Sequence, residues 1–175
     1  HFHIKIDTGM GRIGFPVSEE SADIIERISR LPNVRLEGMF THFAKADETD
    51  KSYTMTQHER FMWMKEQIER RGVSIRYFDC DNSAGIIDLP DMRHDLARAG
   101  ISTYGMYPSD EVKKEAVDLK PALRLVSHVT YVKEVAAGTP ISYGGTFVAP
   151  EKMKVATIPV GYGDGYPRSL SNKGY

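Results

Sequence analysis

Three short apolar stretches, which end near residues 6, 41 and 80, constrain the fold of this chain most strongly. They lie roughly 35 to 40 residues apart, and helical patterns of apolar positions separate them. Repeated strand–helix units of this kind form a parallel sheet, either open or closed into a barrel. A fourth apolar run, at residues 96–101, completes four units, which is half of an eight-fold barrel. The sequence therefore predicts an α/β fold.

Two of the predicted helices have clear boundaries. Ser18 is a typical N-cap for the first helix, and Pro32 ends it. The second helix is expected over residues 53–71, with Gly72 as its stop. Its apolar positions recur at helical spacing, which predicts that one face packs on the sheet; these positions are Phe61, Met64 and Ile68.

The pattern changes after residue 108. The polar segment Pro108–Glu111 is typical of a domain boundary, so we expect residues 109–120 to be a linker. From residue 121 onward, apolar and polar residues alternate with period two, which predicts the beginning of an incomplete antiparallel β domain in residues 121–175. Because the chain has no initiating methionine and opens within a predicted strand, we expect it to be an internal fragment.

The composition excludes several classes of protein. The net charge of −1 gives no basic field for nucleic acid or for an anionic membrane, and no apolar run reaches the length of a membrane helix. Cys80 is the single cysteine, which suits a reducing cytoplasm. Asp79 and Asp81 flank it and disfavour a thiolate, so we interpret Cys80 as a packed strand residue rather than a nucleophile.

The segment Lys5–Phe15 places three glycines directly after the first predicted strand. Residues 9–14 fit the G-x-G-x-x-G pattern of dinucleotide-binding proteins. That pattern requires a helix that opens within it, so that the helix N-terminus meets the pyrophosphate. Here the first good helix start is at Ser18, which disfavours this interpretation.

The same segment resembles a segment of the alanine racemases, pyridoxal-phosphate enzymes with a barrel and a β domain. Further segments with the same resemblance follow in family order along nearly the whole chain. They are K-x-D-T-G-M-G-R-x-G at residues 5–14, T-H-F-A-x-A-D-E at 41–48, N-S-A at 82–84, R-x-G-I-x-x-Y-G at 98–105, S-Y-G-x-T at 142–146 and I-P-x-G-Y-x-D-G-Y-P-R at 158–168.

The resemblance implies that residues 1–108 form the C-terminal half of a (β/α)8 barrel that binds pyridoxal 5'-phosphate. Chemistry in such barrels sits at the C-terminal ends of the strands, and a phosphate site commonly follows strands seven and eight. Ser83 would supply a hydroxyl there and also suits a helix N-cap, and Gly100 and Ile101 would supply backbone amides. The N-S-A motif adds Asn82 to the cofactor site.

The remaining site residues are implied by the resemblance alone. Arg98 would face the pyridine nitrogen of the cofactor, and His42 would lie beside it. Arg12 would contact the cofactor and the substrate carboxylate. Lys5 corresponds to a lysine that carries a carbamate in several members. No second histidine or cysteine stands at ligand spacing from His42, so we expect no metal site.

Tyr143 and Tyr162 complete the implied site. Tyr143 would exchange the α-proton on one face of the substrate, acting in the site of a partner subunit, so a homodimer is expected. As a base near neutrality it would have to lose its proton far below its usual range, and His42 and Arg98 are the candidate cations that would favour this. Tyr162 would lie at the substrate entrance.

The implied activity is the interconversion of L- and D-alanine by two-base proton transfer, which supplies D-alanine for peptidoglycan. No lysine stands in the K-A-N-A-Y-G context that the family uses to hold the cofactor covalently, so we expect the 175 residues alone to be inactive. A racemase of serine or lysine, or a non-catalytic pyridoxal-phosphate-binding barrel protein, is the alternative.

Overall fold

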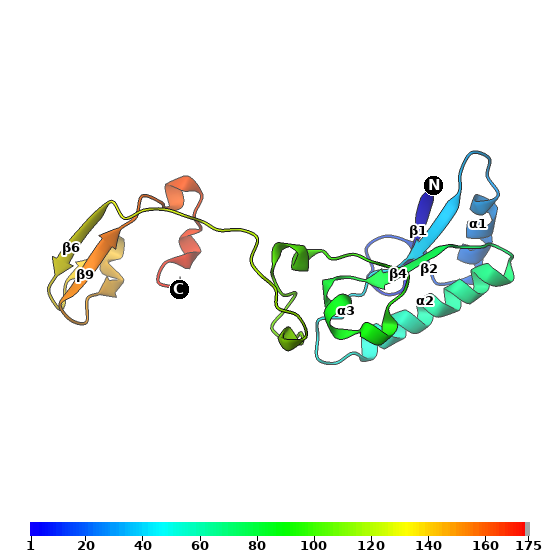
Figure 1. Ribbon diagram of the computed structural model, residues 1–175, viewed down its shortest axis with the longest axis horizontal. Coiled ribbons are helices and arrows are strands. Elements are labelled where there is room, and N and C mark those ends of the chain that lie inside the picture. The colour runs from blue at the N-terminus through cyan, green and yellow to red at the C-terminus, as the bar shows by residue number, and fades with distance from the viewer. Residues whose placement is uncertain (174–175) are drawn as a thin grey trace. The chain divides into compact units, whose positions relative to one another are not determined.

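The computed structural model describes residues 1–173. The chain divides into two compact units, His1–Leu123 and Arg124–Tyr175, and each is described by itself (Figure 1). Among residues 1–173, no helix is both long and apolar enough to cross a membrane.

A five-stranded parallel sheet forms the centre of the first unit. Its spatial order is β2-β1-β3-β4-β5, and every neighbouring pair is parallel. This arrangement confirms the predicted α/β fold with a parallel sheet. The strands are β1 (Phe2–Asp7), β2 (Phe15–Pro16), β3 (Leu36–Phe40), β4 (Tyr77–Asp81) and β5 (Leu96–Ala97).

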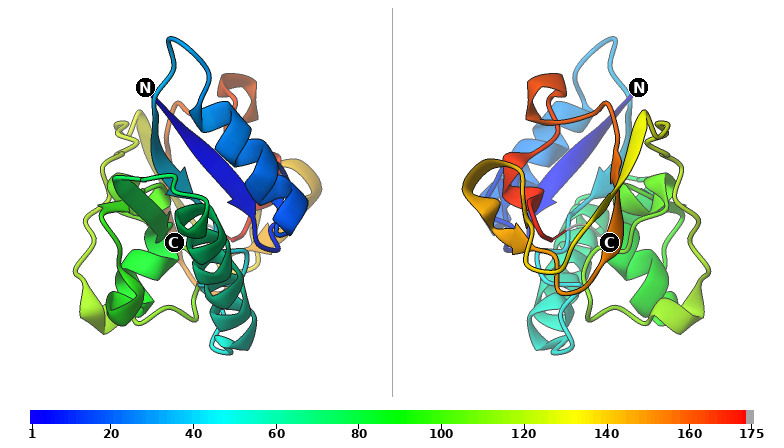
Figure 2. Two further views of the ribbon diagram at one scale, coloured as in Figure 1. Left: turned by 90° about the vertical axis from the view of Figure 1, so that its right-hand side faces the viewer. Right: turned by 90° about the vertical axis from the view of Figure 1, so that its left-hand side faces the viewer.

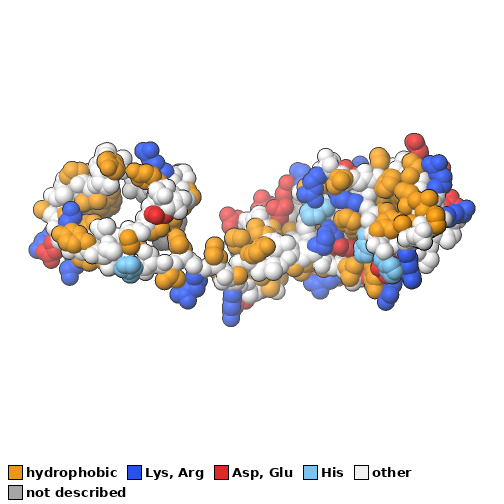
Figure 3. Space-filling model, turned by 90° about the horizontal axis from the view of Figure 1, so that it is seen from above, with side chains coloured by type: hydrophobic (Ala, Val, Ile, Leu, Met, Phe, Trp, Pro, Cys, Tyr) orange, Lys and Arg blue, Asp and Glu red, His pale blue; other side chains and the backbone are white. Residues whose placement is uncertain are grey.

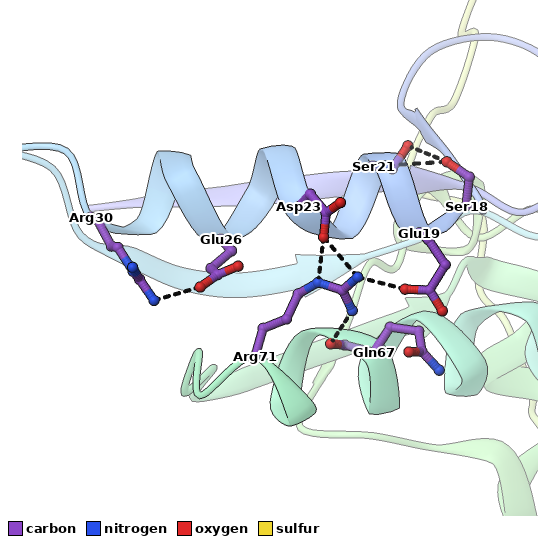
Figure 4. Close-up of polar contacts among 8 residues, drawn as sticks. All are labelled: Ser18, Glu19, Ser21, Asp23, Glu26, Arg30, Gln67 and Arg71. Carbon is purple, nitrogen blue, oxygen red and sulfur yellow. Dashed lines mark hydrogen bonds and ion pairs between the residues drawn. The ribbon is translucent and has the colours of Figure 1, made fainter.

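Two long helices, α1 (Glu19–Ser29) and α2 (Ser52–Arg70), lie on one side of this sheet (Figure 2). The Oγ of Ser18 accepts a hydrogen bond from the backbone N–H of Ser21 at 3.1 Å, so the predicted N-cap is confirmed. Arg71 joins the two helices, because its Nη2 lies 2.5 Å from Glu19 Oε2 and 2.7 Å from Asp23 Oδ1 (Figure 4).

The core lies between the sheet and these helices. Because side chains alternate across a strand, β1 sends Ile4 and Ile6 into this layer. The predicted apolar face of α2 packs against them, and its residues Phe61, Met64 and Ile68 are fully buried. Cys80 is also buried, as predicted, and burial together with the neighbouring carboxyl groups raises the pKa of its thiol.

The predicted fourth strand is shorter than the apolar run that suggested it. Only Leu96–Ala97 pairs with β4, and the chain then turns at Gly100 into the short helix η2 (Ile101–Tyr104). Three further helices of the unit are short: α3 (Ser83–Asp88), η1 (Pro90–Met92) and η3 (Lys114–Ala116).

Residues 109–120, for which we expected a linker, pack on the first unit. Val112 is buried, and Glu111 Oε2 accepts a hydrogen bond from the N–H of Thr49 at 2.6 Å. Tyr107 Oη donates to the carbonyl oxygen of Val117 at 2.7 Å. The contact with Thr49 attaches the segment to the loop between β3 and α2, and Tyr107 holds its later part.

The second unit is built from two antiparallel pairs. Strand β6 (Tyr131–Val135) pairs with β9 (Met153–Thr157), and β7 (Pro140–Ile141) pairs with β8 (Phe147–Val148). The antiparallel pairing agrees with the period-two pattern, but the alternation before Tyr131 does not form a strand because no strand among the described residues pairs with it. Three short helices complete the unit: η4 (Tyr143–Gly145), η5 (Tyr162–Asp164) and η6 (Arg168–Leu170).

Candidate active site

The carboxyl ends of β1, β3, β4 and β5 lie along one edge of the sheet because these strands are parallel. Each strand delivers polar side chains to this edge. They are Lys5 and Asp7 from β1, His42 after β3, Asp79 to Ser83 from the end of β4, and Arg98 after β5. Loops of such parallel α/β sheets are the usual place for binding and chemistry.

Arg98 is at the centre of this edge. Its Nη1 pairs with Asp79 Oδ2, and its Nη2 donates to the carbonyl oxygen of Thr41 at 2.8 Å. The guanidinium also lies 5.2 Å from the centre of the Phe40 ring. These contacts from β3 and β4 fix the plane of the guanidinium. A guanidinium has five N–H donors, so donors remain for a ligand at the open edge.

His42 lies directly beside this guanidinium. Arg98 Nη2 approaches His42 Nδ1 at 3.3 Å, and because a guanidinium only donates, Nδ1 must accept. The neutral ring therefore carries its proton on Nε2. Burial lowers the pKa of His42, and the charges of Arg98, Arg12 and Lys5 lower it further. His42 is thus neutral at pH 7, and of the two candidate cations only Arg98 remains charged.

Two buried carboxyl groups of β4, Asp79 and Asp81, belong to this edge, and sequence reasoning did not assign them a role. Burial raises the pKa of Asp79, although Arg98 opposes the rise. Asp81 is 1% exposed, and burial and the charge of Asp79 raise its pKa to about 6. Neither oxygen of Asp81 has a hydrogen-bond partner among the described residues. The sequence signal that could have identified these two residues was a carboxyl group within an otherwise apolar strand.

Ser83 and the loop after β5 meet at the N-terminus of α3. Ser83 Oγ accepts hydrogen bonds from the N–H of Ser102 at 3.2 Å and from Ser102 Oγ at 3.1 Å. A Cβ on Gly100 would lie 3.7 Å from Ser83 Oγ, so the loop passes close to the hydroxyl. The N–H of Gly100 itself donates to the carbonyl oxygen of Arg98 at 2.9 Å.

The helix cap is Asn82 and not Ser83. Asn82 Oδ1 accepts from the N–H of Gly85 at 3.0 Å, while its Nδ2 donates to the carbonyl oxygen of Phe43 at 3.1 Å. The N-cap interpretation of Ser83 was therefore wrong, because the extended backbone that a cap requires falls one residue earlier. Ser83 is the first residue of α3, and its hydroxyl does not cap the helix.

Strand β1 and the loop after it carry two cations, Lys5 and Arg12. Lys5 Nζ donates to the carbonyl oxygen of Ile13 at 2.7 Å, and Asp7 Oδ1 accepts from the N–H groups of Gly9 and Gly11. Burial lowers the pKa of Lys5, and the charge of Arg12 lowers it further. Arg12 itself is exposed, and its charge also lowers the pKa of His42.

Two glycines of this loop lie so close to other atoms of the protein that a Cβ at either position would be crowded. A Cβ on Gly9, whose φ is +142°, would lie 2.5 Å from Tyr53 Oη. A Cβ on Gly14 would lie 2.9 Å from the carbonyl oxygen of Lys5. Helix α1 begins only at Glu19, after the extended residues of β2. The dinucleotide interpretation therefore lacks its helix, and at least two glycines have structural reasons.

Tyr143 and Tyr162 both line one hollow of the second unit, which has a volume of about 980 Å³ (Figure 3). Tyr143 is 89% exposed and follows Ser142, a residue with a positive φ of 60°. The wall also contains Phe147, Arg168 and Asn172. The structure thus brings the two predicted tyrosines of this unit to one cavity.

The residues of the first unit fit pyridoxal phosphate. A serine hydroxyl at a helix N-terminus suits a phosphate, and a held guanidinium with remaining N–H donors suits a ring nitrogen. Within residues 1–173, no group of three or more His, Cys, Asp and Glu side chains is placed to hold a metal ion.

Comparisons with known proteins agree over both units. Residues 1–108 match the family model of the N-terminal domain of alanine racemase, and residues 122–175 match that of its C-terminal domain. An alanine racemase of Clostridium tetani is 48% identical over 172 residues, which are 98% of this chain and 44% of the relative. One of Methanococcus maripaludis is 45% identical over 97% of this chain and 46% of the relative.

Solved structures give the same result. An alanine racemase of Clostridium difficile 630 has a TM-score of 0.80 and 44% identity, over 95% of this chain and 43% of that chain. The enzyme from E. faecalis has a TM-score of 0.81 and 39% identity, over 96% of this chain and 44% of that chain. The chain thus spans somewhat less than half the length of these relatives. It belongs to the alanine racemase family.

Proposed function

We propose that the protein is a pyridoxal-phosphate-dependent racemase that interconverts L- and D-alanine. The observation that carries this proposal is the guanidinium of Arg98, which Asp79 and the carbonyl oxygen of Thr41 hold beside a neutral His42 at the carboxyl edge of the sheet. The relatives named alanine racemase support the choice of alanine as substrate.

Seven residues of the first unit would hold the cofactor. Ser83 and the loop of Gly100 and Ile101 would bind its phosphate, with Asn82 fixing the helix start, and Arg98 would face the ring nitrogen. His42 and Arg12 would complete the site. Pyridoxal phosphate, when bound, withdraws electrons from the substrate Cα and thereby weakens its C–H bond.

Arg98 determines how strong this electron withdrawal is. A guanidinium stays protonated at physiological pH, so Arg98 would donate to the ring nitrogen and would leave that nitrogen without a proton. A weaker electron sink favours return of the proton to Cα over side reactions. Arg12 would hold the substrate carboxylate.

The proton itself would move to and from Tyr143 Oη on one face of the substrate. Its exposed position suits a role in the site of a partner subunit, so the protein would be a homodimer. A lysine that holds the cofactor would act on the other face, and none of the 175 residues stands in its sequence context. Tyr162, which lines the same hollow as Tyr143, would lie at the substrate entrance.

Lys5 would carry a carbamate. Carbamate formation requires a neutral amine, and burial and Arg12 lower the pKa of Lys5, which increases the neutral fraction. The modified side chain would be an anion beside Arg12. Mass spectrometry of the native protein, with ¹³C-bicarbonate NMR, tests this proposal; an unmodified Lys5 contradicts it.

The architecture completes the proposal. Residues 1–108 would be the second half of a (β/α)8 barrel, residues 109–120 a connection, and residues 121–175 the beginning of the β domain. The unpaired Cys80 and the supply of D-alanine for peptidoglycan are consistent with a cytoplasmic protein.

The test is a racemase assay of the purified full-length gene product with pyridoxal phosphate. We expect turnover of L-alanine to D-alanine, detected by chiral chromatography, to exceed turnover of serine and lysine. Faster turnover of serine or lysine would identify that amino acid as the substrate in place of alanine. Cofactor binding without turnover of any of them would favour a non-catalytic protein. We expect residues 1–175 alone to produce no D-alanine.

A further inference from the structure

Helix α2 presents three polar side chains toward the loops of the candidate site. Tyr53, Gln57 and Arg60 are four and then three residues apart, so they lie on one face of the helix. All three make hydrogen bonds to the residues that follow β1 or β3. We refer to Tyr53, Gln57 and Arg60 as the α2 clamp.

Gln57 is the centre of the α2 clamp and is fully buried. Its Oε1 accepts from the N–H of Ala44 at 2.8 Å, and its Nε2 donates to the carbonyl oxygen of His42 at 3.2 Å. A backbone N–H only donates and a carbonyl oxygen only accepts, so the orientation of the amide is fixed. The amide thus holds the backbone on both sides of Phe43, immediately after His42.

The same amide begins a directed chain of buried hydrogen bonds. Gln57 Nε2 also donates to Thr8 Oγ1 at 3.2 Å, and the hydroxyl oxygens of Thr8 and Thr41 are 2.7 Å apart. Thr41 Oγ1 donates to the carbonyl oxygen of Ile6 at 2.9 Å, so Thr8 must be the donor to Thr41. The carbonyl oxygen of Thr41 in turn accepts from Arg98.

The other two members of the α2 clamp hold the backbone of the glycine loop. Tyr53 Oη donates to the carbonyl oxygen of Gly9 at 2.8 Å, and Arg60 Nη1 donates to that of Thr8 at 2.9 Å. Tyr53 Oη crowds Gly9, whose φ of +142° already strains any L side chain at this position. This loop continues directly to Arg12.

We propose that the α2 clamp positions the backbone that carries Arg12 and His42, with Gln57 as its principal positioning residue. This inference rests on the proposed racemase function. Gln57 acts through Ala44, His42 and Thr8 and has no role in proton transfer. Its replacement therefore displaces the catalytic side chains without removing any of them.

Two substitutions and a control test Gln57 in the full-length gene product. Gln57→Leu leaves the N–H of Ala44 and the carbonyl oxygen of His42 without their buried partner. Gln57→Glu keeps the acceptor for the N–H of Ala44 and loses the donor to the carbonyl oxygen of His42 at any pH at which its carboxyl group is ionised. The control is Gln67→Leu, because Gln67 is also a buried glutamine of α2 and its side chain makes no hydrogen bond within residues 1–173.

We expect Gln57→Leu to lower kcat/KM about 10- to 100-fold, since small displacements of catalytic groups have effects of this size, and Gln67→Leu to lower it less than about threefold. For Gln57→Glu, activity relative to wild type should recover as the pH falls, because the protonated carboxyl group donates to His42 again. Equal kcat/KM for Gln57→Leu and Gln67→Leu, with active wild type, would overturn the inference and leave the proposed function intact.

A second measurement does not depend on racemase activity. In residues 1–175, amide hydrogen exchange at Ala44 and the NMR-determined pKa of His42 report the backbone and the ring directly. We expect Gln57→Leu, and not Gln67→Leu, to accelerate exchange at Ala44 and to shift the pKa of His42. If the wild-type gene product is inactive while these shifts occur, the proposed function fails and the positioning role stands. Unchanged exchange and an unchanged pKa contradict the role itself.

Discussion

The two units hold their candidate catalytic side chains in different ways. In the first unit, Arg98 is fixed by Asp79 and by the backbone of Thr41, and His42 is fixed by Arg98 and by the backbone contacts of Gln57. In the second unit, Tyr143 is 89% exposed in a short turn. The first group is therefore preorganised by its own unit, while the structure shows no comparable contacts that fix the phenol of Tyr143.

The largest expected effect is that of a substitution at Tyr143, which should lower the racemisation rate without lowering the stability of the fold. We expect Tyr143→Phe in the full-length gene product to reduce racemisation about 1,000-fold, because the proposed proton carrier would be lost. The midpoint of thermal unfolding should stay the same, because the hydroxyl of an exposed side chain contributes little to the fold. Chiral assay and calorimetry measure the two quantities. A large fall in the unfolding midpoint would place Tyr143 in a packed core instead.

A pair of substitutions compares the packing of the two units. Met39→Ala in the buried centre of β3 should reduce the free energy of unfolding by about 3 kcal/mol, because it leaves a cavity. Val132→Ala in β6, where the side chain is 53% exposed, should change it by less than about 0.5 kcal/mol. Urea unfolding of residues 1–175 measures both. Equal losses of stability for the two variants would contradict the difference in packing between the two units.

A third substitution tests how the first unit holds its guanidinium. Arg98→Gln should reduce the free energy of unfolding by about 2 kcal/mol, because it leaves Asp79 buried without its ion-pair partner. Adding Asp79→Asn to this variant should restore part of the loss, since it removes the stranded charge. Urea unfolding of the single and double variants measures the coupling. A double variant less stable than Arg98→Gln would contradict the pairing.

The last expected effect depends on pH and concerns the buried carboxyl group of Asp81. Burial and Asp79 raise the pKa of Asp81 to about 6, so the folded state keeps this proton to higher pH than the unfolded state. The resulting stabilisation is complete below about pH 4 and is lost as the pH rises through about 6. Because an amide does not titrate, Asp81→Asn should not lose stability as the pH rises through about 6.

We therefore expect the variant to gain about 2 kcal/mol of stability relative to wild type between about pH 4 and about pH 7. Urea unfolding at several pH values measures the gain. The matched control is Asp118→Asn, at an exposed carboxylate, which should change stability by less than about 0.5 kcal/mol at each pH. A pH-independent difference for Asp81→Asn would show that this carboxyl group titrates normally.

Sequence patterns predicted the elements better than the contacts between them. Helical periodicity found α1 and α2, and the spacing of apolar runs found the parallel strands, because these signals are local. The pairing of Arg98 with Asp79 was not predicted, since it depends on the register of two strands. The contacts of Gln57 were also missed, because a glutamine in a helix looks like a surface residue until its burial is known.

Gly9 shows how a glycine pattern acquires a second explanation. The hydroxyl that excludes a side chain at this position comes from a tyrosine 44 residues further along the chain. Because the φ of +142° at Gly9 strains any L side chain, we expect glycine to persist at this position even where a smaller residue replaces Tyr53. A glycine pattern that resembles a nucleotide-binding loop can therefore arise from contact with a helix of the same chain.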